Sequence, residues 1–477
     1  MEVSLNISDR ELEKSKPFKQ NMEGKPKSKK RKWISIVLTL LLISALGVGI
    51  YSAYKGYKIT KDIGFNFDPG QLIEKPKEPE LKKDSTGKFT NVLLVGIDTR
   101  EKTKLLNTDV LIVASYNYET KNIVMVSIPR DFEAQVNPDK YWFNKINSSY
   151  AVNEQKKEGS GLPQLQRVVE GVTGMEIQYY AMIDFKGFVD LIDSVGGIYV
   201  NVENSFTDYK YPLGNGYQKV SFTSGPQLMD GDTALKYSRS RHSQQNGEGS
   251  DYARARRQQK VLTALKDVIL TSETLLNPTK IMGMITAIQD NIKISEFTLD
   301  DIEAGVNILK ELKDSTSESY SFVLDPMAGN KSLIAVQPTV AYSIAPIAGL
   351  GKYDNIHEYL DLVLANPKLY SENPSIYVYN AGLGSKEASE KTKELKLHFK
   401  YLNIVYKQTL YSDKEGIHVF SNKDAEFEYS VNQLSKYLKT ENILKPEYIT
   451  TKLNREDISI LLGKEPIVVQ DIQESTN

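Results

Sequence analysis

The first hydrophobic segment of this 477-residue chain runs without a charged residue from Ile34 to Tyr54. As a helix, such a run is long enough to cross about 30 Å of hydrocarbon. Six Lys and Arg residues stand directly before it, between Lys25 and Lys32. Because such residues stay on the cytoplasmic side, the pattern predicts a basic cytoplasmic tail (1–33), a transmembrane signal anchor (34–54) and an extracellular remainder. The alternative, a cleaved signal peptide, is disfavoured because no Ala-x-Ala site follows the segment.

Residues 55–87 contain three prolines among many Lys and Glu residues, which is typical of a stalk. The pattern then changes to short apolar runs separated by amphipathic segments. Runs rich in β-branched residues predict strands, and apolar residues at helical spacing predict helices. The expected strands are Phe89–Ile97, Val110–Tyr116, Ile123–Ile128, Tyr179–Ile183 and Ile198–Val202, and the expected helices begin at Phe185 and at about Asp251. Strands that alternate with helices indicate an α/β domain.

A second unit is predicted after residue 370, where the pattern begins again. An apolar run at Ile376–Tyr379 precedes a glycine-containing turn, a Lys/Glu-rich helix to about Phe399 and a strand near Ile404. The turn lacks the third glycine of a dinucleotide-binding loop, so we interpret it as a plain strand-to-helix turn. We therefore expect a main domain at 88–365 and a second small α/β domain at 372–477.

Composition narrows the chemistry that the chain can perform. The absence of cysteine excludes disulfides, thiolate metal sites and a cysteine nucleophile. The net charge is −1, so any anion-binding site must be local. The four histidines show no paired ligand spacing, and His242, which could touch the candidate site, is interpreted as incidental. Neither a Walker A nor a GxSxG motif is present.

An arginine-rich stretch between Arg239 and Gln258 is the main candidate site. It contains five arginines, which are Arg239, Arg241, Arg254, Arg256 and Arg257, around Asp251. Arginine binds phosphate oxygens in a planar, multidentate way. If Ser250 or Asp251 caps the helix, Arg254, Arg257 and Gln258 share its first turns, where the helix dipole also favours an anion. Outside a membrane, a lipid-linked phosphate or pyrophosphate is the expected ligand.

Two details of this stretch remain open in the sequence. Arg239 and Arg241 alternate, so their side chains would share a face if they ended a strand. A solvated helix start whose arginines pair with Glu248 and Asp251 is the alternative to a phosphate site.

Three further charged residues stand at the ends of the first three predicted strands. Asp98 follows the first, Asp109 opens the second and Arg130 follows the third. If these strands are antiparallel, the three side chains meet at one edge of the sheet. Two aspartates suit Mg²⁺, which proteins usually hold with one or two carboxylates plus substrate phosphates. Taken singly, each residue is more often a turn-forming aspartate or a rim arginine, and only their joint placement favours a site.

At these residues the chain resembles the LytR-CpsA-Psr family of membrane-anchored enzymes, which attach lipid-carried glycopolymers to the bacterial cell wall. The matching stretches are Asn91–Asp98, Thr108–Asp109, Val126–Asp131, Asn144–Asn147 with Ser149–Tyr150, Asp184–Val189 with Val195–Gly197, Met229–Gly231 with Ala234–Arg241, and Ser250–Arg254 with Arg257–Gln258. Val378–Asn380 and the helix after them resemble the LytR C-terminal module. Asn144, where the family commonly has an acidic residue, and Thr108, before Asp109, depart from the usual pattern.

The resemblance implies an α/β sandwich with a mixed central sheet and an apolar tunnel for the lipid tail. It implies that Asp98 and Asp109 bind Mg²⁺ and that Asp251 lies at the same site. For the reaction we take Asp98, Arg130 and Asp251 as the candidate catalytic residues, and the general base is left open between Asp98 and Asp251. The implied pyrophosphate-binding residues are Arg130, Lys145, Arg239, Arg241, Arg254, Arg257 and Gln258.

The function expected from this resemblance is a Mg²⁺-dependent phosphotransferase that moves a polyprenyl-pyrophosphate-linked glycopolymer, such as teichoic acid or capsule, onto peptidoglycan. The expected setting is the outer face of the cell membrane of a Gram-positive bacterium, with no nucleic acid as partner. The alternatives are a polyprenyl-pyrophosphate pyrophosphatase and a non-catalytic, membrane-bound cell-wall regulator.

Overall fold

The computed structural model describes residues 79–464, with gaps at 99–105, 138–139, 215, 270–288, 297–300, 302–303, 306, 309–310, 313–317, 327–332, 338–342, 424–425 and 450–455. The predicted cytoplasmic tail and signal anchor therefore lie outside the described residues. Within the described ranges, no helix is both long and apolar enough to cross a membrane.

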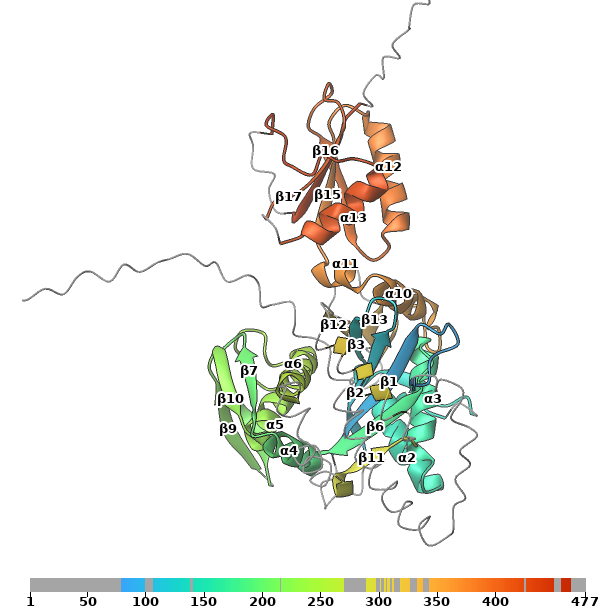
Figure 1. Ribbon diagram of the computed structural model, residues 1–477, viewed down its shortest axis with the longest axis vertical. Coiled ribbons are helices and arrows are strands. Elements are labelled where there is room, and N and C mark those ends of the chain that lie inside the picture. The colour runs from blue at the N-terminus through green and yellow to red at the C-terminus, as the bar shows by residue number, and fades with distance from the viewer. Residues whose placement is uncertain are drawn as a thin grey trace, which may run out of the picture.

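A six-stranded mixed sheet forms the centre of the main domain (Figure 1). Its strand order is β11 (Ile292–Ile294), β6 (Tyr179–Asp184), β1 (Phe89–Ile97), β2 (Thr108–Asn117), β3 (Ile123–Ser127) and β12 (Ser319–Val323). β1 pairs antiparallel with β2, which pairs antiparallel with β3. β1 is parallel to β6, and β3 is parallel to β12. The predicted strands and the mixed sheet are confirmed.

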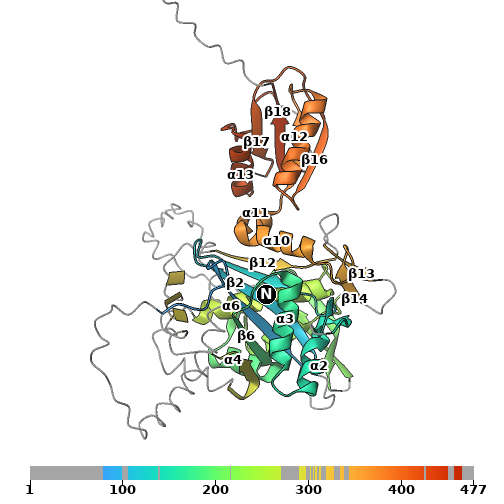
Figure 2. The same ribbon diagram turned by 90° about the vertical axis from the view of Figure 1, so that its right-hand side faces the viewer.

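The two faces of this sheet bury different side chains because successive residues of a strand point to opposite sides. Leu93 and Val95 of β1 pack on the side of α3 (Gly161–Thr173), in a cluster that also holds residues of α10 (Asp354–Ala365). Leu94 packs on the other side, with Ile308. Figure 2 shows α3 and α2 (Ser149–Lys156) lying over the first of these faces. Short strand pairs flank the sheet: β4 (Glu133–Gln135) with β5 (Phe143–Lys145), and β13 (Ile334–Gln337) with β14 (Ser343–Pro346).

A lobe built from residues 185–269 lies beside the sheet. Its helices are α4 (Phe185–Ser194), α5 (Gly231–Arg239) and α6 (Asp251–Ile269). Its strands form two antiparallel ribbons, β7 (Ile198–Val202) with β10 (Gly225–Met229), and β8 (Phe206–Leu213) with β9 (Gly216–Phe222). The inner faces of both ribbons and the three helices share one apolar core. Gly231 lets α5 approach α4, because a Cβ there would lie 2.4 Å from the Val189 carbonyl oxygen.

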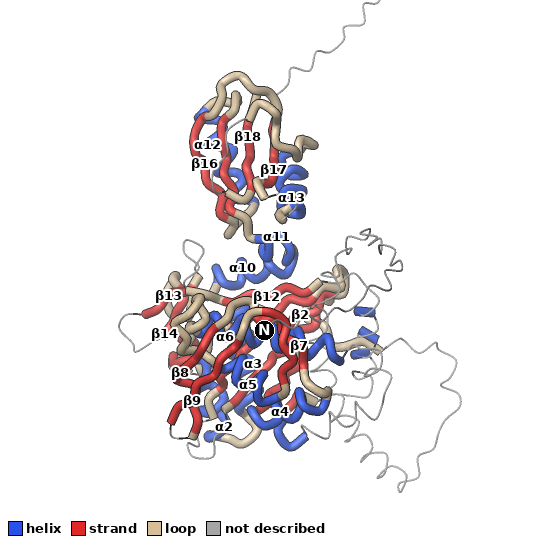
Figure 3. Tube along the Cα trace, turned by 90° about the vertical axis from the view of Figure 1, so that its left-hand side faces the viewer, coloured by secondary structure: helices blue, strands red, loops and turns tan. Residues whose placement is uncertain are grey.

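A second α/β unit follows α10 and α11 (Pro367–Glu372) (Figure 3). Its sheet has the order β16 (Asn403–Thr409), β15 (Ser375–Asn380), β18 (Ile458–Leu462) and β17 (Ile417–Ser421), accompanied by α12 (Ser385–His398) and α13 (Glu428–Leu438). The predicted strand-to-helix turn is present between β15 and α12: Asn380 Oδ1 accepts hydrogen bonds from the amides of Gly382 (3.1 Å) and Gly384 (2.9 Å).

The described end of the predicted stalk, residues 79–87, lies against the main domain. Leu81 is buried in the apolar cluster beneath β1 and β2. The Lys82 amide donates to the Tyr179 hydroxyl over 2.9 Å, and the Ser85 amide donates to Glu176 over 2.7 Å. These contacts make residues 81–85 part of the folded domain.

Candidate active site

The edge of the sheet gathers the three charged residues that the strand pattern places there. Asp98 follows β1, Asp109 is the second residue of β2, and Arg130 follows β3. Because the strands alternate in direction, these positions share one edge, as predicted. Arg130 Nη1 donates to Asp109 Oδ1 over 2.6 Å, and its Nε lies 3.5 Å from Asp131 Oδ2. Burial lowers the pKa of Arg130, but the carboxylates of Asp109, Asp251 and Asp131 outweigh it, so the net shift is upward.

The N-terminus of α6 supplies a second guanidinium. Ser250 caps this helix, since its Oγ accepts a hydrogen bond from the Ala253 amide over 3.0 Å. Arg254 Nη1 lies 3.0 Å from Asp251 Oδ1. Burial, opposed by Asp251 and reinforced by Arg130, lowers the pKa of Arg254 to about 10. Arg254 therefore remains charged at neutral pH, and it is held there by carboxylates.

Arg239 and Arg241 come from a helix end and not from a strand end. Arg239 is the last residue of α5, and the extended backbone of Ser240 turns both side chains towards the same cavity. Arg239 lies with its guanidinium carbon 3.9 Å from the centre of the Phe185 ring and its Nη2 3.9 Å from Asp98 Oδ2. Arg241 Nη1 lies 3.9 Å from Asp251 Oδ1.

These groups surround the mouth of a cavity of about 1360 Å³, its open part included, between the sheet and the lobe. The charged and polar lining comprises Asp109, Arg130, Asp184, Ser238, Arg239, Arg241, His242, Arg254 and Gln258. The rest is mainly apolar, with Leu94, Ile112, Ala181, Ile183, Phe188, Leu191, Leu235, Val261, Leu262 and Leu265. The side chains of Arg239 and Arg241 are 21% and 37% exposed, whereas Leu94, Leu191 and Leu265 are buried. We therefore take the cationic part of the cavity as its mouth and the apolar part as its interior.

A smaller hollow of about 440 Å³ lies against the same arginines. It shares Asp109, Arg130, Arg254 and Gln258 with the larger cavity, and adds Asp131 and Asp251. The shared residues therefore separate two spaces, one largely apolar and one bordered by three carboxylates.

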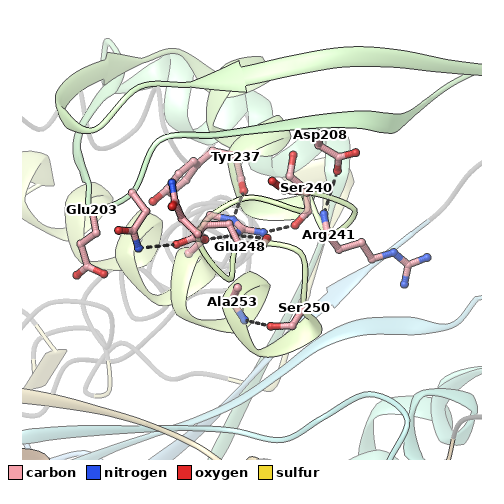
Figure 4. A network of polar contacts seen from close by, with 12 residues as sticks. Glu203, Asp208, Tyr237, Ser240, Arg241, Glu248, Ser250 and Ala253 are labelled. Atoms are coloured by element: carbon pink, nitrogen blue, oxygen red, sulfur yellow. Dashed lines mark hydrogen bonds and ion pairs between the residues drawn. The ribbon is translucent and has the colours of Figure 1, made fainter.

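Arg257 is a correction to the predicted site, because it lines neither space. Its guanidinium is buried and donates to the carbonyls of Tyr237 (2.9 Å), Glu248 (3.0 Å) and Ser240, and to the Glu248 carboxylate. The pairing with Glu248 that the alternative reading proposed is therefore present, but buried and not solvated. Figure 4 shows Glu248 in this network beside Tyr237 and Ser240, with the Arg241 side chain extending away from it.

Lys145 and Asp98 lie beside the site and not on the cavity walls. Lys145 Nζ lies 2.9 Å from Asp131 Oδ1, so it reaches Arg130 through that carboxylate. Asp98 reaches the cavity through its ion pair with Arg239. Both retain a place next to the predicted phosphate site.

Four residues at the site were missed or undervalued in the sequence. His242 lines the cavity, contrary to the expectation that it is incidental. Phe185 and Tyr211 contact the Arg239 guanidinium, the latter by accepting a hydrogen bond of 3.4 Å. Asp208 is fully buried in β8, and its Oδ2 accepts the amides of Arg241 (3.0 Å) and His242 (3.2 Å). A carboxylate on the apolar side of an alternating strand was the available signal for Asp208.

Asp208→Asn is expected to destabilise the backbone that carries Arg241. Asparagine keeps one acceptor oxygen but places an NH₂ group among backbone donors, and such a mismatch costs about 1–3 kcal/mol of unfolding free energy. Chemical denaturation measures this cost, and the affinity for the anionic ligand should fall with it. Asp232→Asn, at an exposed position of α5, is the control; equal stability of the two variants would contradict the role given to Asp208.

The donor set fits a Mg²⁺ ion that is completed by a ligand. Within the described ranges, no group of three or more His, Asp and Glu side chains is arranged to hold a metal by itself. Asp109 stands at the cavity mouth, and Asp98 is one residue beyond the neighbouring strand. Asp251 Oδ1 is buried and makes no hydrogen bond, although two arginines lie near it. One or two carboxylates with phosphate oxygens is the arrangement that Mg²⁺ commonly adopts.

Comparisons with known proteins bear on the family of the chain. The LytR_cpsA_psr family matches residues 61–329, more than half of the chain. The polyisoprenyl-teichoic acid–peptidoglycan teichoic acid transferase TagU of Bacillus licheniformis is 29% identical over 281 residues, which are 59% of this chain and 83% of that protein. TagV of Bacillus subtilis is 30% identical over 277 residues, 57% of this chain and 68% of TagV. The crystal structure of B. subtilis TagV aligns with a TM-score of 0.44 and 24% identity, covering 58% of this chain and 98% of that one. The chain belongs to the LytR-CpsA-Psr family.

Proposed function

We propose that this protein is a phosphotransferase that moves a polyprenyl-pyrophosphate-linked glycopolymer onto peptidoglycan at the outer face of the membrane. The observation that carries the proposal is the joining of four arginines to an apolar cavity in one site. A ligand with a diphosphate at one end of a long hydrocarbon matches both the arginines and the apolar part of the cavity. Relatives named as teichoic acid transferases support the same reaction class.

The arginines bind the diphosphate in this proposal. Arg130 and Arg254 are held in place by Asp109 and Asp251, so little side-chain entropy is lost when the ligand arrives. Arg239 and Arg241 complete the cationic mouth, and Gln258 adds an amide donor. The apolar residues of α4 and α6 then cover the first part of the polyprenyl chain, which removes hydrocarbon from water.

The reaction is a substitution at phosphorus. A hydroxyl of peptidoglycan attacks the phosphorus next to the sugar, a new P–O bond forms, and the bond to the bridging oxygen breaks. Polyprenyl phosphate leaves with the electron pair, and its negative charge develops beside Arg130 and Arg254. The hydroxyl proton passes to a carboxylate, for which Asp98 and Asp251 are the candidates. Mg²⁺ held by Asp98 and Asp109 would supply further charge neutralisation.

The test uses the full chain in liposomes with labelled lipid-linked glycan and peptidoglycan. Appearance of label on peptidoglycan together with free polyprenyl phosphate is the expected result. Release of glycan phosphate without transfer would instead identify a pyrophosphatase. Binding without turnover, with Mg²⁺ present, would identify a non-catalytic wall regulator. Either of the last two results overturns the proposal.

Removal of divalent metal is expected to stop transfer while leaving the protein folded. The carboxylates of Asp98, Asp109 and Asp251 are paired with arginines, so the fold does not need the ion. Transfer should fall to background in a chelator and return when Mg²⁺ is added, with the circular dichroism spectrum unchanged. Asp109→Asn should raise the Mg²⁺ concentration needed for half-maximal rate. Full activity in the chelator would remove Mg²⁺ from the mechanism.

A further inference from the structure

The β8–β9 hairpin presents an unusual outer surface next to the cavity mouth. Its inner residues, such as Phe206 and Phe222, are buried in the lobe core. Tyr209, Leu213 and Tyr217 are exposed instead, with exposed fractions of 64%, 59% and 70%. Tyr217 pairs with Pro212 and Leu213 with Gly216, so large exposed side chains stand on both faces of the hairpin beyond the lobe core. Large side chains at this level of exposure in so short a segment indicate an interaction surface.

The exposed charges on the two strands of the hairpin are both positive. Lys210 and Lys219 are exposed, and Lys219 Nζ lies 5.6 Å from the centre of the Tyr209 ring. Asp208, the acidic residue of these two strands, is buried and bound to backbone amides. Tyrosine, leucine and lysine without exposed acid is the composition that favours the boundary between water and an anionic bilayer.

The hairpin is continuous with the site. Pro212 lines the cavity, and Tyr211 contacts Arg239 at its mouth. Pro212 pairs across the hairpin with Tyr217, so the exposed ring lies on the strand next to the cavity wall. A polyprenyl ligand begins in a bilayer, and the mouth must approach the lipid headgroups to receive it.

We propose that the exposed side chains of the β8–β9 hairpin, those of Tyr209, Lys210, Leu213, Tyr217 and Lys219, dock on an anionic lipid bilayer and hold the cavity mouth at headgroup level. The aromatic rings and Leu213 enter the headgroup boundary, and the lysines meet lipid phosphates. This inference rests on the proposed function, because that function requires the cavity to receive a lipid-linked substrate. The contact between the hairpin and the bilayer can nevertheless be measured without any transfer reaction.

The absence of cysteine in the natural sequence permits a direct test, since each introduced thiol is the single one. Leu213→Cys and Tyr217→Cys on the hairpin, and Tyr141→Cys and Leu444→Cys at other highly exposed positions, carry a bimane label. The full-length variants are placed in liposomes of equal parts phosphatidylglycerol and phosphatidylcholine. Lipid spin-labelled near the headgroup should quench the two hairpin probes severalfold more than the two controls. Equal quenching at all four positions overturns the proposal.

The lysines provide the second arm of the test. Lys210→Glu with Lys219→Glu should lower the ratio of docked to undocked hairpin by roughly fivefold or more per lysine. Replacing the mixed liposomes by pure phosphatidylcholine should also lower this ratio for the unchanged hairpin. Quenching that ignores both changes contradicts anionic lipid as the partner. In detergent without a bilayer, shielding of the hairpin probes from iodide by soluble peptidoglycan strands would show a glycan platform instead, and would also overturn the proposal. Loss of transfer with normal quenching would count against the proposed function alone.

Discussion

Arg130→Ala is expected to reduce transfer by about 10²–10³-fold or more, the loss typical of removing one preorganised charge donor from a phosphoryl or acyl transfer site. Arg130 stands between the two hollows and is already oriented by Asp109 and Asp131. Its charge is therefore in place before the leaving group develops its own. Initial rates with labelled lipid-linked glycan, at saturating peptidoglycan, measure the effect.

Two variants separate this effect from general loss of positive charge. Arg130→Lys keeps a cation but loses the planar fork, so it should recover only a small part of the rate. Arg256→Ala removes an exposed arginine two residues after Arg254 in α6 and should leave the rate unchanged. Wild-type activity in Arg130→Ala would remove the sheet edge from the reaction. A fall of similar size in Arg256→Ala would mean that the assay reports net charge and not the site.

The sheet edge could be predicted because it depends on local pattern alone. Buried strands are marked by apolar, β-branched runs, and a short polar turn such as Asn117–Asn122 forces the next strand to return alongside. Once β1, β2 and β3 are known to alternate in direction, the neighbourhood of Asp98, Asp109 and Arg130 follows from geometry. The prediction needed no knowledge of how helices pack.

The arginine cluster could be predicted only in part, because helix rotation depends on tertiary packing. Arg254, Arg257 and Gln258 share roughly one face of a helix, yet the structure divides them. Arg254 and Gln258 face the cavity, whereas Arg257 turns under α5 to the carbonyls of Tyr237 and Ser240. Tyr237 belongs to α5, and the loop at residues 240–250 supplies the Ser240 and Glu248 carbonyls. No periodic pattern in the sequence predicts the path of that loop.

The apolar part of the cavity could not be mapped onto particular residues from the sequence either. Its walls come from the sheet, α4, α5 and α6, which are distant in sequence. Each of these elements needs apolar residues in any case, in order to pack against its neighbours. A leucine that lines a cavity has the same sequence signature as a leucine in a packed core. What distinguishes them is the gap left between sheet and lobe. The cavity therefore exists only when both the sheet and the lobe are assembled.

Arg257→Ala is expected to lower the free energy of unfolding by about 3–5 kcal/mol, because it leaves the buried Glu248 carboxylate without its cation. It also removes the donors that satisfy the Tyr237 and Ser240 carbonyls, and the cationic contact with the Phe206 ring, whose centre lies 4.7 Å away. Burial lowers the pKa of Arg257, but the pairing with Glu248 opposes that shift, so the side chain belongs to the fold in its charged form.

Urea denaturation of Arg257→Ala and Arg256→Ala gives the comparison, since the two positions are adjacent on α6 and differ in burial. The exposed Arg256 should change stability by no more than about 0.5 kcal/mol. Arg257→Ala combined with Glu248→Leu should recover part of the loss, because removing both charges relieves the uncompensated carboxylate. A fully stable but inactive Arg257→Ala would mean that this guanidinium meets the diphosphate after all, and the division of the arginines into one structural member and four ligand-binding members would be wrong.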